Sequence, residues 1–131
     1  ETIQNNFEEK YKLGSATIHE QNKLNYEKYE IYKVKTKKLD DLLVNKKIGF
    51  IKIDVEGHEK NVLNGSLNII NQNKPNLLVE IEEKHSKEKV EDTINFIKKL
   101  GYKSYYLDRQ NLMSTDNLKD FSHKNNYIFI P

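Results

Sequence analysis

The chain has 131 residues, and its 22 basic and 20 acidic residues are mixed along the length to give a net charge of +2 at pH 7. This length supports one domain with its own core, and so small a net charge argues against nucleic acid or an anionic membrane as a partner. The absence of cysteine excludes disulfides, thiolate zinc sites and thiol nucleophiles, and it favours a cytoplasmic protein. The sequence also has no apolar run of about 18 residues and no signal-peptide profile at its start, so we expect no membrane partner.

The first third of the chain contains few clear elements. Residues 1–28 are polar and predict an irregular or hairpin lead-in to a single domain over residues 1–131. Residues 29–36 alternate as a strand does, and residues 39–43 have the spacing of a short helix with three leucines on its buried face.

The central stretch, residues 48–59, reads as a strand that passes into a helix. Its apolar run ends in Asp54, Glu56, Gly57 and His58, and helical spacing then continues to about residue 72. We expect Gly65 to let this helix lie close to the sheet.

The remaining elements alternate in type. We expect a strand over 77–82, a helix from near Ser86 to Gly101, strands over 102–107 and 127–130, and a polar connection with a short helix near 115–121. This order predicts an α/β fold with three layers and a mostly parallel sheet, with an antiparallel strand at the C-terminus.

Three side chains at the central junction are candidate catalytic groups. Residues 54 and 56 project to the same side of an extended chain, and ligands bind at the carboxyl edge of an open parallel sheet. Asp54, Glu56 or His58 is therefore placed to take a proton from an acceptor hydroxyl, and the two carboxylates are an alternative site for a divalent cation. In a purely structural interpretation, Asp54 caps the following helix, Glu56 and Glu59 stabilise its positive end, and His58 is solvated.

Several short motifs, in order, resemble the C-terminal part of the FkbM-type methyltransferase family. The matching words are VKTKKLDDLL at 34–43, IKIDVEGHE at 51–59, VLNGS at 62–66, KP at 74–75, VEI at 79–81, GY at 101–102 and YIFIP at 127–131. The resemblance runs from about residue 30 to the end of the chain. It implies a Rossmann-like fold, S-adenosyl-L-methionine as cofactor, and a small-molecule or carbohydrate hydroxyl as methyl acceptor. It also implies that Asp54 faces the methionine end of the cofactor and the acceptor. From their places in the chain, Glu80 at the matching end of the next strand and His85 after it are candidate acceptor-binding residues, and the alternative for His85 is a solvated charged loop.

The sequence departs from this family in its N-terminal part. The family holds its cofactor with a glycine-rich loop after the first strand, whereas Gly14 is the only glycine in the first 40 residues here. The resemblance therefore implies a C-terminal portion that lacks the N-terminal strands and is inactive in isolation.

Two other functions stay open. One is a non-catalytic α/β assembly module that forms a homo-oligomer through an exposed sheet edge. The other is a metal-dependent phosphoryl-transfer domain in which Asp54 and Glu56 hold magnesium, although no nucleotide-binding loop accompanies them.

Overall fold

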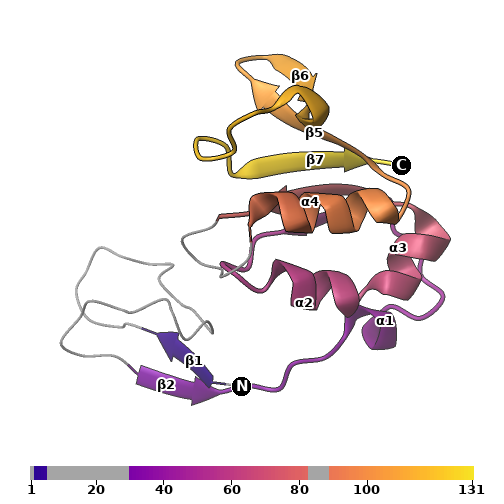
Figure 1. Ribbon diagram of the computed structural model, residues 1–131. Helices are drawn as coiled ribbons and strands as arrows, with labels where there is room; N and C mark the ends of the chain where they lie inside the picture. The colour runs from indigo at the N-terminus through magenta and orange to yellow at the C-terminus, as the bar shows by residue number, and fades with distance from the viewer. Residues whose placement is uncertain (1, 6–29, 83–88) are drawn as a thin grey trace. The chain divides into compact units, whose positions relative to one another are not determined.

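The computed structural model describes residues 2–5, 30–82 and 89–131, which fall in two compact units, Glu1–Lys37 and Lys38–Pro131 (Figure 1). In the first unit, β1 (Thr2–Asn5) pairs antiparallel with β2 (Glu30–Lys33). The predicted strand over 29–36 is confirmed in its first half. Most of the predicted lead-in, residues 6–28, lies outside the described residues.

The second unit contains the helices and a five-stranded sheet. Its elements are α1 (Leu39–Leu42), β3 (Phe50–Ile53), α2 (Glu59–Asn64), α3 (Leu67–Asn73), β4 (Asn76–Glu80), α4 (Val90–Lys99), β5 (Lys103–Asp108), β6 (Asn111–Ser114), the 3-10 turn η2 (Thr115–Asn117) and β7 (Asn126–Ile130).

The strand order is β3-β4-β7-β5-β6, and only β3 and β4 pair in parallel. The predicted α/β class and the antiparallel C-terminal strand are confirmed, but the prediction of a mostly parallel sheet is wrong. The reason is that β7 inserts between β4 and β5, where Tyr127 and Phe129 become fully buried. Because β7 is antiparallel to both neighbours, β3, β4 and β5 all run in the same direction.

The hydrophobic core lies on one face of this sheet. Buried side chains of the strands and of α2, α3 and α4 form a single cluster, whose members include Ile53, Leu63, Ile70, Leu77, Val79, Ile94, Ile97, Tyr127 and Phe129. On the other face, Phe50 is 58% exposed and Leu107 is 53% exposed. The described residues thus form two layers of the predicted three.

The predicted helix over 57–72 is broken into α2 and α3. The hydroxyl of Ser66 donates to the backbone carbonyls of Val62 (2.7 Å) and Leu63 (3.1 Å), which end α2. Side-chain bonds of this kind compete with the helical ladder, and the periodicity of the apolar residues does not reveal them.

The second segment, α3, is capped by a residue from far upstream. The Asp40 carboxylate accepts hydrogen bonds from the backbone amides of Asn68 (3.1 Å) and Ile69 (3.0 Å). A side chain built on Gly65 would approach Lys38 and not the sheet, so our expectation for this glycine is wrong. The predicted buried face of α1 is also wrong, since Leu42 is 53% exposed and α1 buries none of its residues.

The helix α4 confirms the prediction of a strong helix that stops at a glycine. It ends before Gly101, whose φ of 93° favours glycine. The N-cap is Lys89, and Ser86 lies outside the described residues. Every helix in the described ranges is too short or too polar to span a bilayer.

The β5–β6 hairpin was not predicted, because its turn at Arg109 and Gln110 lies in a polar stretch that resembles a loop. Of the helix predicted near 115–121, only the turn η2 forms.

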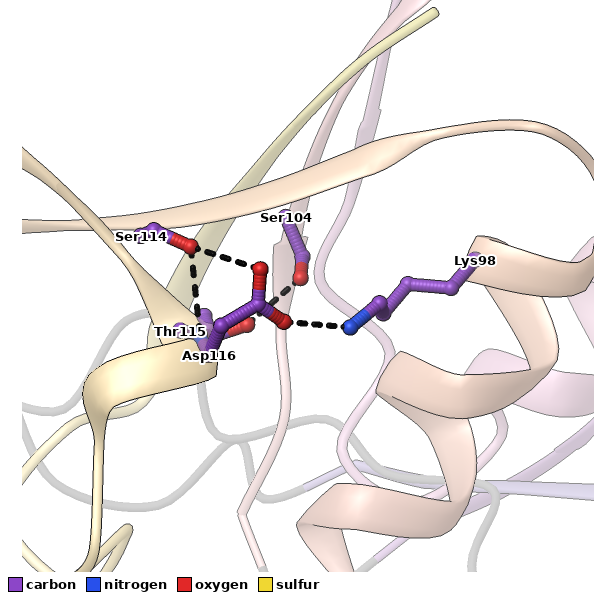
Figure 2. A network of polar contacts seen from close by, with 5 residues as sticks. All are labelled: Lys98, Ser104, Ser114, Thr115 and Asp116. Atoms are coloured by element: carbon purple, nitrogen blue, oxygen red, sulfur yellow. Dashed lines mark hydrogen bonds and ion pairs between the residues drawn. The ribbon is translucent and has the colours of Figure 1, made fainter.

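A polar network joins this hairpin to α4 (Figure 2). Lys98 of α4 binds the Asp116 carboxylate of η2, and Ser114 donates to the other carboxylate oxygen at 3.1 Å. These hydrogen bonds hold the pKa of Asp116 below its ordinary value. Next to this network, the buried hydroxyls of Ser104 and Thr115 bind each other (Figure 2). The network therefore fixes the start of the segment that leads back to β7.

Candidate active site

The ends of three strands meet at one edge of the sheet. Because β3, β4 and β5 run in the same direction, all three end at the edge where β7 begins. Asp54 directly follows β3, Glu80 ends β4 and Asp108 ends β5. We call this the carboxyl edge.

Asp54 is solvent-accessible and lies next to a lysine. Its Oδ2 atom is 2.9 Å from Lys52 Nζ, on the preceding strand β3. This contact raises the pKa of Lys52, because it stabilises the charged ammonium. The Asp54 carboxylate is therefore available at the surface but electrostatically balanced by one cation.

Glu80 is the neighbour of Asp54 across the two parallel strands. The register pairs Ile53 with Val79, which places the following residues side by side. Burial raises the pKa of Glu80, and the nearby carboxylates of Asp54 and Glu82 raise it further, whereas Lys52 lowers it. A carboxylate with a raised pKa binds a proton more readily than an ordinary glutamate.

Asn125 holds two acidic residues in place, one at the end of β4 and one just after it. Its side-chain Nδ2 donates to Glu80 Oε1 at 3.2 Å and to Glu82 Oε1 at 3.0 Å. Its backbone carbonyl accepts from the amide of Ile81 at 2.7 Å. Sequence reasoning missed this residue, because the pair Asn125-Asn126 before a strand indicates only a turn.

The turn between β3 and α2 has two residues with positive φ. Glu56 has a φ of 46° and Gly57 a φ of 101°, a conformation that is unusual for a glutamate. The amide of Gly57 donates to Glu59 Oε1 at 2.8 Å, and Glu59 is only 5% exposed. The carboxylate of Glu59 thus stabilises the turn, while the Glu56 side chain is exposed.

His58 is the N-cap residue of α2 and is half-buried. Its Nδ1 lies 2.9 Å from the side-chain amide of Asn61, so the prediction of a solvated histidine is wrong. Because α2 begins at Glu59, Asp54 lies too far upstream to cap it, and that structural alternative is also wrong. The remaining candidate, His85, lies outside the described residues.

The described residues give no support to a magnesium site at Asp54 and Glu56. Within those ranges, no group of three or more His, Cys, Asp or Glu side chains is placed to hold a metal ion.

Comparison with known protein families identifies the chain. The family model described as the methyltransferase FkbM domain matches residues 3–104. The chain belongs to the FkbM methyltransferase family. Searches of curated proteins and of solved structures returned no significant match.

The family match supports a methyltransferase and revises the extent of the resemblance. It begins at residue 3, not near residue 30, and it ends at Ser104 in β5. The motif YIFIP at 127–131 lies beyond it, in the strand β7 that fills the centre of the sheet.

The residues at the carboxyl edge fit part of an FkbM cofactor site. The exposed carboxylate of Asp54 suits the ammonium at the methionine end of S-adenosyl-L-methionine. The five glycines of the sequence stand at 14, 49, 57, 65 and 101, so they supply no glycine-rich turn for the nucleoside.

Proposed function

We propose that this FkbM-family domain serves in the transfer of a methyl group from S-adenosyl-L-methionine to a hydroxyl oxygen of a small molecule or sugar. The observation that carries the proposal is the pair of neighbouring carboxylates, Asp54 and Glu80, at the carboxyl edge of a methyltransferase-family domain. When bound, the cofactor would supply the methyl group and keep the electron pair of the broken sulfur–methyl bond. The acceptor oxygen forms the new bond to carbon and loses its proton.

The two carboxylates are suited to different roles. We assign Asp54 to the cofactor, because its carboxylate is exposed and held in position by Lys52. Glu80 is suited to receive the hydroxyl proton, because its surroundings raise its pKa. Glu56 and His58 follow Asp54 in the adjoining turn, and we include them in the candidate catalytic group.

The 131 residues alone are expected to be inactive, since they contain no glycine-rich turn for the nucleoside. A cytoplasmic location suits the proposal, because the chain has no cysteine.

The test is calorimetric titration of S-adenosylhomocysteine into the 131-residue chain and into the complete gene product. We expect binding to the complete gene product, weakened at least about tenfold in Asp54→Ala, which corresponds to 1.4 kcal/mol. Asp41→Ala removes a surface carboxylate away from the edge and should leave the affinity unchanged. Absence of binding to both proteins would contradict the cofactor assignment.

A second candidate function is assembly of two copies through β3. This strand is terminal in the described sheet, and its Phe50 side chain is 58% exposed. Exposed apolar strands at a sheet edge are sites of pairing. Light scattering after size-exclusion chromatography should then detect a dimer that Phe50→Glu dissociates and Leu112→Glu, on the opposite terminal strand β6, does not. A monomeric parent protein would rule this candidate out.

A further inference from the structure

A cavity of about 430 Å³ lies at the carboxyl edge, next to the end of β4. Its walls are Ile81 and Glu82 after β4, Val90 at the start of α4, and residues 121–125 before β7. Apart from Ile81, which ends the VEI motif, none of these residues belongs to the motifs quoted above. We call it the edge cavity.

One wall of the edge cavity is apolar and packs against the hydrophobic core. Ile81 and Val90 belong to the buried core cluster. Phe121 is half-buried and packs against the fully buried ring of Tyr127, with 6.2 Å between the ring centroids. The cavity therefore offers a preformed aromatic and aliphatic surface of the kind on which the C–H face of a ring packs.

The other wall carries hydrogen-bonding groups. Glu82 and Asn125 form it, and they are fixed by the hydrogen bond between them, while Ser122 and His123 are exposed at its mouth. The same Asn125 amide binds Glu80, the neighbour of Asp54. A continuous polar path thus joins the edge cavity to the candidate catalytic carboxylates.

The local charge disfavours an anionic ligand. Asp54, Glu80 and Glu82 lie together, and the charges of Asp54 and Glu82 add to the effect of burial in raising the pKa of Glu80. Among the described residues, two lysines near the edge cavity, Lys52 and the lining residue Lys124, have acidic or aromatic partners. Lys52 pairs with Asp54, and Lys124 Nζ is 3.6 Å from Asp108 Oδ1 and 5.2 Å from the centroid of the Tyr106 ring.

We propose that the edge cavity binds an uncharged, hydroxyl-rich ring, a carbohydrate ring, stacked on Phe121 with its hydroxyls toward Glu82 and Asn125. Carboxylate and amide oxygens accept hydrogen bonds from hydroxyl groups, and the aromatic wall takes the less polar face of the ring. Resting on the function proposed above, the edge cavity is the acceptor subsite of the methyl transfer. A carboxylate or phosphate ligand would meet like charges there. A simple amine would make no packing contact with the Phe121 ring.

The experiment is an NMR titration of the ¹⁵N-labelled protein with a panel of methyl pyranosides of glucose, galactose, mannose, fucose and rhamnose. At least one pyranoside should shift the amide signals of residues 81, 82 and 121–125, with a dissociation constant in the millimolar range, about 4 kcal/mol of binding free energy. Inorganic phosphate and cyclohexylamine serve as the anionic and cationic probes and should leave these signals in place.

Two variants sharpen the test. Phe121→Leu keeps an apolar side chain but removes the ring, and it should weaken pyranoside binding at least fivefold while the remaining spectrum stays that of the parent. Asn71→Ala, on the exposed side of α3, is the matched control and should bind as the parent does.

The proposal is overturned if no pyranoside shifts these signals up to about 100 mM, far above the millimolar constant expected. It is also overturned if the shifts fall outside the edge cavity, if phosphate or cyclohexylamine causes them equally, or if Phe121→Leu binds like the parent. The titration contains no methyl donor, so its failure leaves the S-adenosylhomocysteine result standing. Failure of that binding experiment likewise leaves a carbohydrate site intact.

Discussion

The side-chain amide of Asn125 donates a 3.2 Å hydrogen bond to Glu80 Oε1, although the two residues lie 45 positions apart. The same amide donates to Glu82, on the other side of Ile81. One asparagine therefore joins the end of β4 to the segment that enters β7, at the edge where the acidic residues gather.

We predict that Asn125→Ala lowers the free energy of unfolding by about 1–3 kcal/mol, because two part-buried carboxylates lose a hydrogen-bond donor. Urea denaturation followed by circular dichroism measures this change. Asn71→Ala, an exposed position on α3, should change stability by less than about 0.5 kcal/mol. Equal effects of the two substitutions would show that the bonds of Asn125 contribute nothing.

The cap that Asp40 provides to α3 gives a second prediction. Asp40→Ala should destabilise the protein by about 0.5–2 kcal/mol, because the amides of Asn68 and Ile69 lose their acceptor. Asp40→Asn retains an acceptor oxygen and should recover part of the loss. Asp41→Ala is the matched control, since its side chain is exposed on the same short helix. Thermal or chemical denaturation that ranks Asp41→Ala with Asp40→Ala would refute the capping role.

Two glycines with different backbone conformations, Gly101 after α4 and Gly49 before β3, allow a direct comparison. Gly101 has a φ of 93°, so Gly101→Ala should cost about 1–2 kcal/mol of stability from backbone strain alone. At Gly49 an alanine side chain would meet no atom within 4 Å, and the backbone there does not have a positive φ. Gly49→Ala should therefore be neutral or slightly stabilising. Denaturation curves of the two variants test this difference, and equal stabilities would contradict it.

The pH dependence of stability should report on Glu80. Its pKa in the folded protein lies above the ordinary value of 4.5, so the folded state binds this proton more tightly than the unfolded state does. The stabilising contribution is therefore fully present below pH 4.5 and is lost as the pH rises through the folded-state pKa.

The measurement is the difference in melting temperature between the parent and Glu80→Gln, taken at a series of pH values from 4 to 8. The difference removes the contribution of other acids, of which Asp116 and Asp120 have lowered pKa values and act in the opposite direction. We expect Glu80→Gln to gain stability relative to the parent as the pH rises. A difference that stays constant over the range would mean that Glu80 is not perturbed.

The sequence by itself determined the local elements and the candidate junction. The spacing of the apolar residues predicts a strand at the start of the 48–59 stretch and a helix between Ser86 and Gly101, and the structure contains β3 and α4 there. The run from Ile53 to His58 could be recognised as a strand-to-helix turn, because the pattern changes from period two to helical spacing across Gly57. Such signals are local, since they arise from side chains a few residues apart.

Only the tertiary structure decided which strands became neighbours and which polar groups met. Period two places Tyr127 and Phe129 on one face of a strand, but it cannot show that β7 lies between β4 and β5 and makes the sheet mostly antiparallel. The cap of Asp40 on α3, 28 residues away, and the bonds of Asn125 to Glu80 and Glu82 depend on long-range packing. The edge cavity has the same origin, because its walls come from three separate segments that only the folded sheet brings together.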